Sequence, residues 1–122
     1  MKALLLIAHG SRRTQSNTEV LLLADKLKQK CSEHYPIIHA GFLEFALPLI
    51  PDAIKKCADD GATSIIVLPY FLNSGRHVIE DIPTIVNDTE NDYPNVEIKI
   101  APHLGDSALM LDLLINSANA TK

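Results

Sequence analysis

The sequence predicts an α/β domain built on a doubly wound, flavodoxin-like parallel sheet of four strands, in the order 2-1-3-4, with helices on both faces. Three observations lead to this prediction. Apolar runs of strand length alternate along the chain with stretches whose apolar residues recur at helical spacing. Such alternation requires a parallel sheet with right-handed crossovers. Two of the runs are almost purely apolar, so the strands they form belong at the centre of the sheet.

The four predicted strands differ in polarity. Residues 3–8 and 64–68 form nearly unbroken apolar runs, as expected for central strands that are buried on both faces. Residues 37–42 and 96–100 carry polar side chains at intervals, which indicates strands nearer the edges, with one face less protected. Placing the two apolar strands side by side gives the order 2-1-3-4.

Four predicted helices each carry apolar residues on one face. These residues are Val20, Ala24 and Leu27, then Ile50, Ala53, Ile54 and Cys57, then Ile82, Ile85 and Val86, and finally Leu109 and Leu113. The sequence Ser16-Asn17-Thr18-Glu19 has the form of a capping box and predicts where the first helix begins. Because no linker, low-complexity tract or repeat interrupts the pattern, we expect residues 1–122 to form a single domain.

The composition narrows the class of protein. An apolar fraction of 47% and a charged fraction of 21% are typical of a folded globular chain. The net charge of −4 argues against a surface that grips nucleic acid nonspecifically. The apolar run near the N-terminus is too short for a signal-peptide core, and no stretch is long enough to cross a bilayer. We therefore expect a cytoplasmic protein that binds neither nucleic acid nor membranes.

Histidines and a glutamate follow the predicted strands. Ligands of doubly wound sheets bind beyond the carboxyl ends of the strands, where the winding direction reverses, here between the first and third strands. His9, Glu44 and His77 follow the first three strands, and His103 follows the fourth. Two imidazoles and a carboxylate can bind Fe, Co, Ni or Zn and leave positions open for a substrate. Whether His103 adds a further ligand stays open, because it follows an edge strand.

All three arginines lie close to these histidines in the sequence. Arg12 and Arg13 follow His9, and Arg76 precedes His77. Helix N-termini add partial positive charge at the same edge of the sheet. Although the chain is acidic as a whole, this grouping predicts a local anion site for a substrate with several carboxylates or phosphates, held by bidentate arginine contacts.

Three segments together resemble a known family. Residues 9–12 read His-Gly-Ser-Arg, residues 42–44 read Phe-Leu-Glu, and residues 69–83 read Pro-Tyr-Phe-Leu-x-x-Gly-x-His-x-x-x-Asp-Ile-Pro. They are similar to the small CbiX-type sirohydrochlorin chelatases, of the class II tetrapyrrole chelatases, and the resemblance covers nearly the whole chain. It implies ATP-independent insertion of a divalent metal into sirohydrochlorin or a related tetrapyrrole, in cobalamin, siroheme or related biosynthesis.

The resemblance also implies a set of participants. Co²⁺ is the favoured metal, with Fe²⁺ or Ni²⁺ as alternatives; each is a substrate, and no organic cofactor is bound. The small members resemble half of a longer two-lobed chelatase and pair as homodimers. The metal-handling and catalytic residues would be His9, His77 and Glu44. The substrate-binding residues would be Ser11, Arg12, Arg13, Tyr70, Phe71, Gly75 and Arg76.

Two other functions compete with this interpretation. A non-catalytic module that carries a metal or a tetrapyrrole would use the same ligands, and only turnover separates it from an enzyme. A histidine-dependent phosphatase is less well supported, because that chemistry resembles an Arg-His-Gly motif and Ala8 stands in the position of the arginine. The residues themselves leave open the physiological metal, the exact tetrapyrrole and the division of base and ligand roles between His9 and His77.

Overall fold

The fold is a four-stranded parallel sheet with helices on both faces. The computed structural model describes residues 1–76 and 80–121. Its strands pair in the order β2-β1-β3-β4, and all three pairings are parallel. They are β1 (Lys2–Ala8), β2 (Ile37–Phe42), β3 (Ser64–Pro69) and β4 (Glu97–Ile100). The fold class and strand order predicted from the sequence are confirmed.

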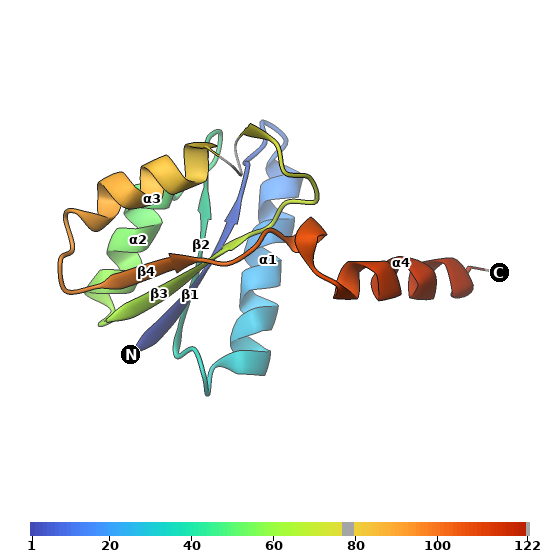
Figure 1. Ribbon diagram of the computed structural model, residues 1–122, viewed down its shortest axis with the longest axis horizontal. Helices are drawn as coiled ribbons and strands as arrows, with labels where there is room; N and C mark the ends of the chain where they lie inside the picture. The colour runs from blue at the N-terminus through green and yellow to red at the C-terminus, as the bar shows by residue number, and fades with distance from the viewer. Residues whose placement is uncertain (77–79, 122) are drawn as a thin grey trace.

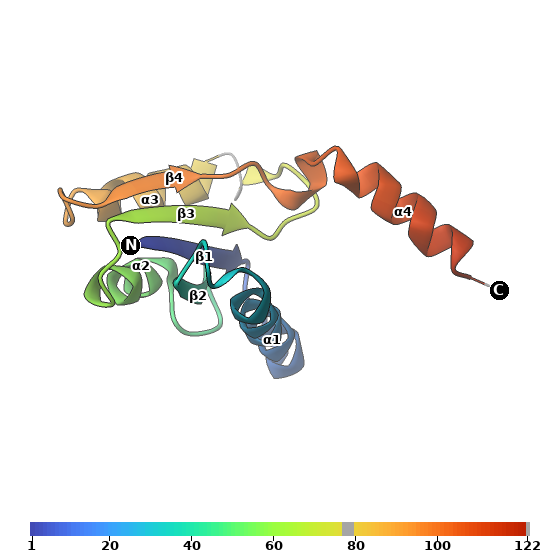
Figure 2. The ribbon, with the colours of Figure 1, turned by 90° about the horizontal axis from the view of Figure 1, so that it is seen from below.

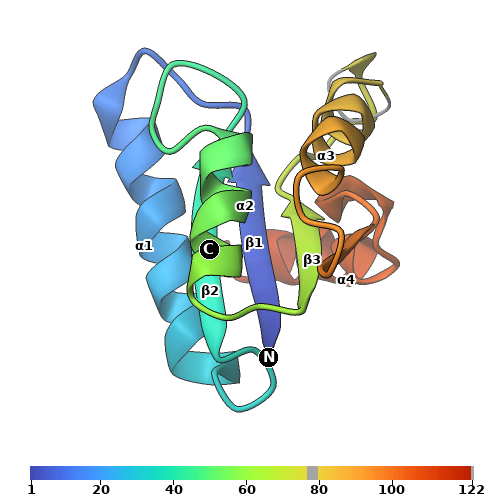
Figure 3. The same ribbon diagram turned by 90° about the vertical axis from the view of Figure 1, so that its left-hand side faces the viewer.

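The helices are divided between the two faces of the sheet. They are α1 (Thr14–Cys31), α2 (Ile50–Asp59), α3 (Ile82–Glu90) and α4 (Leu109–Asn119), with a short 3₁₀ turn, η2 (Leu104–Asp106), before the last. Helices α2 and α3 cover one face and α1 lies on the other (Figures 1 and 3). The first helix begins at Thr14, ahead of the predicted capping box, and Asn17 of that box is bonded to the loop before the helix.

Two apolar clusters form the core, one on each side of the sheet. Between the sheet and helices α2 and α3, the fully buried side chains include Leu5, Ile54 and Val67. Between the sheet and α1, a smaller cluster includes Val20 and Phe42. The larger cluster fixes β1 and β3 as the centre of the sheet, which positions the loops that follow them.

One expectation about β3 is wrong. Its apolar run predicts burial on both faces, but only alternate residues, Ile65, Val67 and Pro69, are buried. Ile66 and Leu68, on the face that α1 shares, are half-buried. The reason is the course of α4, which follows β4 but projects away from the sheet (Figures 1 and 2). In the part of the chain described, no helix is long and apolar enough to cross a membrane.

Candidate functional site

His9 and Glu44 meet at the carboxyl edge of the sheet. His9 follows β1 and Glu44 follows the neighbouring strand β2, and their separation of 35 residues in sequence is closed by the parallel pairing. The Nε2 atom of His9 lies 2.7 Å from Oε1 of Glu44. The two side chains are 43% and 49% exposed, so a ligand can reach both from solvent. The carboxyl-edge rule therefore predicted this convergence correctly.

The main chain fixes this pair. The ladder between β1 and β2 continues past both strands: the N–H of Leu43 donates to the carbonyl of Ala8, and the N–H of Glu44 donates to the carbonyl of His9 at 3.0 Å. Gly10 allows this approach, because a Cβ there would lie 1.7 Å from the carbonyl oxygen of Glu44. Gly10 also has a φ of 93°, which L side chains rarely adopt.

A second contact holds the loop after His9. The side chain of Asn17, in the first turns of α1, accepts a hydrogen bond from the N–H of Ser11 at 2.9 Å and donates one to its carbonyl at 2.7 Å. The hydroxyl of Ser11 accepts a bond from the N–H of Arg13. Ser11 thus takes part in the turn after β1, and its contact with a substrate stays a prediction. Asn17 was assigned only to a capping box, and its role depends on a tertiary contact that the sequence does not signal.

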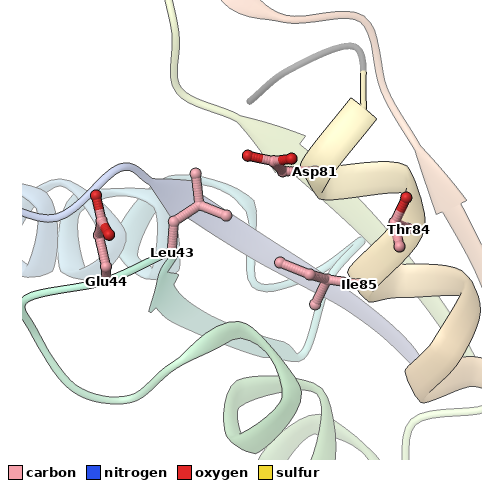
Figure 4. Close-up of a pocket in the computed structure, with 5 residues that line it drawn as sticks. All are labelled: Leu43, Glu44, Asp81, Thr84 and Ile85. Carbon is pink, nitrogen blue, oxygen red and sulfur yellow. The ribbon is translucent and has the colours of Figure 1, made fainter. Parts of the chain in front are cut away.

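A cleft of about 270 Å³ opens beside Glu44. Its lining residues come from two elements: Leu43 and Glu44 from the end of β2, and Asp81, Thr84 and Ile85 from the start of α3. Glu44 and Asp81 stand on opposite sides of it (Figure 4). From the sequence Asp81 is expected only as a possible cap of the third helix, so its place in the lining of this cleft was not predicted.

The predicted three-ligand set is described only in part. His77 lies outside the described residues, so its distance from His9 and Glu44 stays a prediction. Within residues 1–76 and 80–121, no group of three His, Cys, Asp or Glu side chains is arranged to hold a metal ion. His103 precedes η2 and is half-buried, and it joins no such group in these ranges.

The arginines are distributed differently from the single cluster that the sequence suggested. The guanidinium of Arg12 stacks over the ring of Phe45, 5.0 Å from its centroid, in a cation–π contact that joins the loops after β1 and β2. Arg13 contacts Gln15 at 3.4 Å. Arg76 is 80% exposed, and its Nε lies 3.6 Å from a carboxylate oxygen of Glu80. Within the described part of the chain, the stacking on Phe45 thus holds Arg12 against the His9–Glu44 region, whereas the contacts of Arg13 and Arg76 are to residues near them in sequence.

The remaining predicted substrate contacts lie in the loop after β3. Tyr70, Phe71, Leu72 and Leu104 line a small apolar cavity of about 200 Å³. Tyr70 also borders a hollow next to Gly10 and Ser11, which connects this loop to the loop that carries His9. Gly75 is exposed, and a Cβ added there would meet no atom within 4 Å.

Comparison with known proteins gives a consistent set of relatives. The protein-family model described as CbiX matches residues 3–121. The chain is 41% identical to the sirohydrochlorin cobaltochelatase of Methanocaldococcus jannaschii, over 76% of this chain and 64% of that protein. It is 34% identical to the chloroplastic sirohydrochlorin ferrochelatase of Arabidopsis thaliana, over 91% of this chain and 48% of that protein. The chain is also 34% identical to the sirohydrochlorin cobaltochelatase of Sulfolobus acidocaldarius, over 97% of this chain and 90% of that protein.

Solved structures extend the likeness to the fold. SirB from Bacillus subtilis with Fe³⁺ superimposes with a TM-score of 0.86 at 25% identity, covering 99% of this chain and 48% of that chain. SirB from Bacillus subtilis subspecies spizizenii, in complex with cobalt, superimposes with a TM-score of 0.86 at 26% identity, covering 97% of this chain and 50% of that chain. This chain thus spans less than two thirds of several relatives and about half of the SirB chains.

Proposed function

Since the chain belongs to the CbiX family, we propose that it inserts a divalent metal ion into sirohydrochlorin or a closely related tetrapyrrole without ATP. The observation that carries the proposal is the solvent-open contact between His9 and Glu44 at the carboxyl edge of the sheet, where His9 follows one of the two strands that flank the reversal of winding. The names of the relatives, cobaltochelatases and ferrochelatases, support the reaction class and leave Co²⁺ favoured over Fe²⁺ and Ni²⁺.

The geometry of the pair suits transient metal binding. Metal–ligand bonds of about 2.0–2.2 Å place two neighbouring ligand atoms about 3 Å apart. Nε2 of His9 and Oε1 of Glu44 are 2.7 Å apart, so a small rotation converts their contact into a two-atom chelate. Two protein ligands, with His77 as the expected third, leave the metal coordination incomplete. An incomplete set can yield to the four pyrrole nitrogens of the substrate.

Proton transfer uses the same groups. The ring must lose two protons as the metal enters, and a neutral imidazole or a carboxylate can accept them. We assign the proton-accepting role to His77 and His9, with Glu44 holding the imidazole of His9 in place. Asp81, across the cleft from Glu44, supplies a second carboxylate at the site.

Substrate binding follows from charge and shape. Sirohydrochlorin carries eight carboxylates around a flat apolar ring, and the guanidinium of Arg12, stacked on Phe45, offers a held cation beside His9. Arg13 and Arg76 add exposed cations, and Tyr70 and Phe71 offer ring surfaces for the macrocycle. We also propose a homodimer in the cytoplasm, where a reducing environment suits the two free cysteines.

The test is an anaerobic absorbance time course of sirohydrochlorin with Co²⁺, repeated with Fe²⁺ and Ni²⁺. Catalytic amounts of the protein should speed metallation over many turnovers. His9→Ala should lower kcat by about 10²–10⁴-fold, whereas His34→Ala, exposed and past the far end of α1, should match the wild type. Metallation that stops at one equivalent per chain would instead identify a carrier, and no acceleration with any metal would overturn the proposal.

A further inference from the structure

An apolar cavity lies at the carboxyl edge of the sheet, on the β3 side of the site. It has a volume of about 200 Å³ and is lined by Tyr70, Phe71 and Leu72 from the loop after β3 and by Leu104 from η2. Three of these largely apolar side chains are exposed: Tyr70 at 44%, Leu72 at 64% and Leu104 at 38%. Within the described part of the chain, no charged side chain lines the cavity. Exposed apolar side chains gathered around one hollow are typical of a place that receives an apolar group.

The walls of this cavity are fixed by the backbone. The N–H of Tyr70 donates to the carbonyl of Ile7 at 2.8 Å, so the loop after β3 begins as a continuation of the β1–β3 ladder. The N–H of Gly105, in η2, donates to the carbonyl of Phe71 at 3.0 Å. A Cβ at Gly105 would lie 1.7 Å from the carbonyl oxygen of Leu72, so η2 is pressed against this loop (Figures 1 and 2). The cavity is therefore largely preformed, as ligand sites usually are.

The cavity is next to the loop that carries His9. Tyr70 lines the cavity and also borders the hollow beside Gly10, so the two hollows share one aromatic wall. On the other side of β1, toward β2, the guanidinium of Arg12 stacks on the ring of Phe45. The site thus has a cation on its β2 side and an uncharged apolar cavity on its β3 side.

The groups on the rim of sirohydrochlorin divide in the same way. Eight of them are carboxylates, and the other two are methyl groups on adjacent rings, at one edge of the macrocycle. A carboxylate placed in an uncharged cavity loses its water without gaining a partner, which is strongly unfavourable. A methyl group placed there gains free energy from the burial of apolar surface. The cavity is also smaller than the roughly 300–1,000 Å³ of a pocket that holds a whole ligand, so it suits one edge of the ring.

We propose that this cavity receives the methyl-bearing edge of the tetrapyrrole, and that Leu72 and Leu104 thereby select C-methylated tetrapyrroles over unmethylated ones. This inference rests on the proposed function and deepens it, because it names the feature of the substrate that the site recognises and the edge that lies toward β3. One methyl or methylene group in a hydrophobic pocket discriminates by about 10–200-fold. Uroporphyrin III has the same eight carboxylates and no ring methyl groups, so it should bind about 10-fold more weakly than sirohydrochlorin, or weaker still.

The test is a titration of each metal-free tetrapyrrole into the full chain, followed by absorbance. Leu72→Asn and Leu104→Asn place an amide of similar size in the cavity wall. Each should raise the Kd for sirohydrochlorin about 10-fold and change the Kd for uroporphyrin III by less than about 2-fold. Leu22→Asn is the matched control, because Leu22 is a leucine of α1 that is 53% exposed and lies outside the cavity. It should leave both values of Kd unchanged.

The ratio of the two Kd values decides the outcome. Each variant is compared with the wild type on the same ligand, so the different oxidation states of the two rings cancel. Circular dichroism and sedimentation of the same samples report the fold and the association of the chains, and turnover with Co²⁺ reports the chelatase activity.

A preference for sirohydrochlorin that falls in both cavity variants and persists in Leu22→Asn is the expected result. A wild type without that preference, or the same preference in the wild type and both cavity variants, would overturn the inference while leaving the chelatase activity standing. Cavity variants that change the sedimenting mass but not the preference would also overturn it, and would assign the cavity to an interface between chains. Sirohydrochlorin that is neither bound nor metallated would overturn the proposed function, and this inference with it.

Discussion

Replacing Gly10 by alanine is expected to separate Glu44 from His9 while leaving the sheet intact. The added Cβ would lie 1.7 Å from the carbonyl oxygen of Glu44, and real Cβ contacts under 3.0 Å essentially never occur. The loop after β2 must therefore move by more than about 1 Å, since the opposing β1 is held on both sides by the sheet. That movement breaks the hydrogen bond from the N–H of Glu44 to the carbonyl of His9.

The size of the effect follows from two costs. A residue with a Cβ held at a φ of 93° loses about 1–2 kcal/mol relative to glycine. The broken backbone hydrogen bond adds about 1 kcal/mol. We therefore expect the free energy of unfolding to fall by about 2–3 kcal/mol. Displacing a reacting group by about 1 Å costs about 10²-fold in rate, so kcat/KM should fall by that factor.

The measurement pairs urea unfolding with the chelatase time course. Gly61→Ala is the matched control: Gly61 also has a positive φ, of 104°, but it lies between α2 and β3 at the far end of the sheet, and the atom that an added Cβ would meet there is the flexible tip of Met1, at 3.2 Å. It should lose about 1–2 kcal/mol of stability with kcat/KM unchanged. If Gly10→Ala retained wild-type kcat/KM, or if Gly61→Ala lost as much activity, the close approach of Gly10 to the backbone of Glu44 would not be what positions the site.

Three further predictions concern the same region and the core. Asn17→Ala removes both bonds to the backbone of Ser11 and should cost about 2 kcal/mol in urea unfolding and about 10-fold in kcat/KM. Phe45→Leu removes the ring under Arg12 and should raise the KM for the tetrapyrrole about 2–5-fold. Burial raises the pKa of the Cys57 thiol to about 12. Between about pH 9 and 12 the unfolded thiol therefore ionises while the folded one stays protonated, so stability should fall as pH rises through this window.

Each of these has a control within the chain. For Asn17→Ala the control is Thr18→Ala, which removes an exposed hydroxyl that donates to the carbonyl of Thr14 in the same part of α1, and which should leave kcat/KM unchanged. Equal losses of kcat/KM in Asn17→Ala and Thr18→Ala would mean that a change in α1, and not the loss of the bonds to Ser11, causes the effect. Combining Phe45→Leu with Arg12→Ala should raise KM no further than Arg12→Ala alone, and additive effects would mean that the ring acts independently. Cys57→Ala should remove part of the alkaline loss, and an unchanged pH profile would attribute that loss to other groups.

The sheet could be predicted because it follows from local patterns. The apolar runs, the helical spacing between them and the handedness of parallel crossovers leave few arrangements, and the order β2-β1-β3-β4 is one of them. The burial of β3 could not be predicted. The apolar sequence of β3, from Ser64 to Pro69, predicts a strand that is buried on both faces of the sheet. Whether the second face is covered depends on the direction that α4 takes after β4, and the sequence of α4 carries no local signal for that direction.

The site was predictable where it depends on strand ends and not where it depends on side-chain contacts. His9 and Glu44 converge because each follows a strand of one parallel pair. Asn17 was missed, because its position in a capping-box pattern hides its bonds to Ser11. Arg12 stacks on Phe45, and Phe45 has a φ of 65°, a conformation that the sequence does not signal for a phenylalanine.

The continuation of the β1–β2 ladder past the strand ends also determines when the site exists. The amides of Leu43 and Glu44 are bonded to β1 and His9 by the same kind of bond that joins the strands themselves. We therefore expect the backbone of the site to become ordered when the last hydrogen bonds between β1 and β2 form, and to lose its order only when those bonds break. Under the proposed function, a metal ion that reaches His9 would meet a carboxylate whose backbone is already placed by the hydrogen bonds of the sheet, and binding would not have to supply the entropy of arranging it.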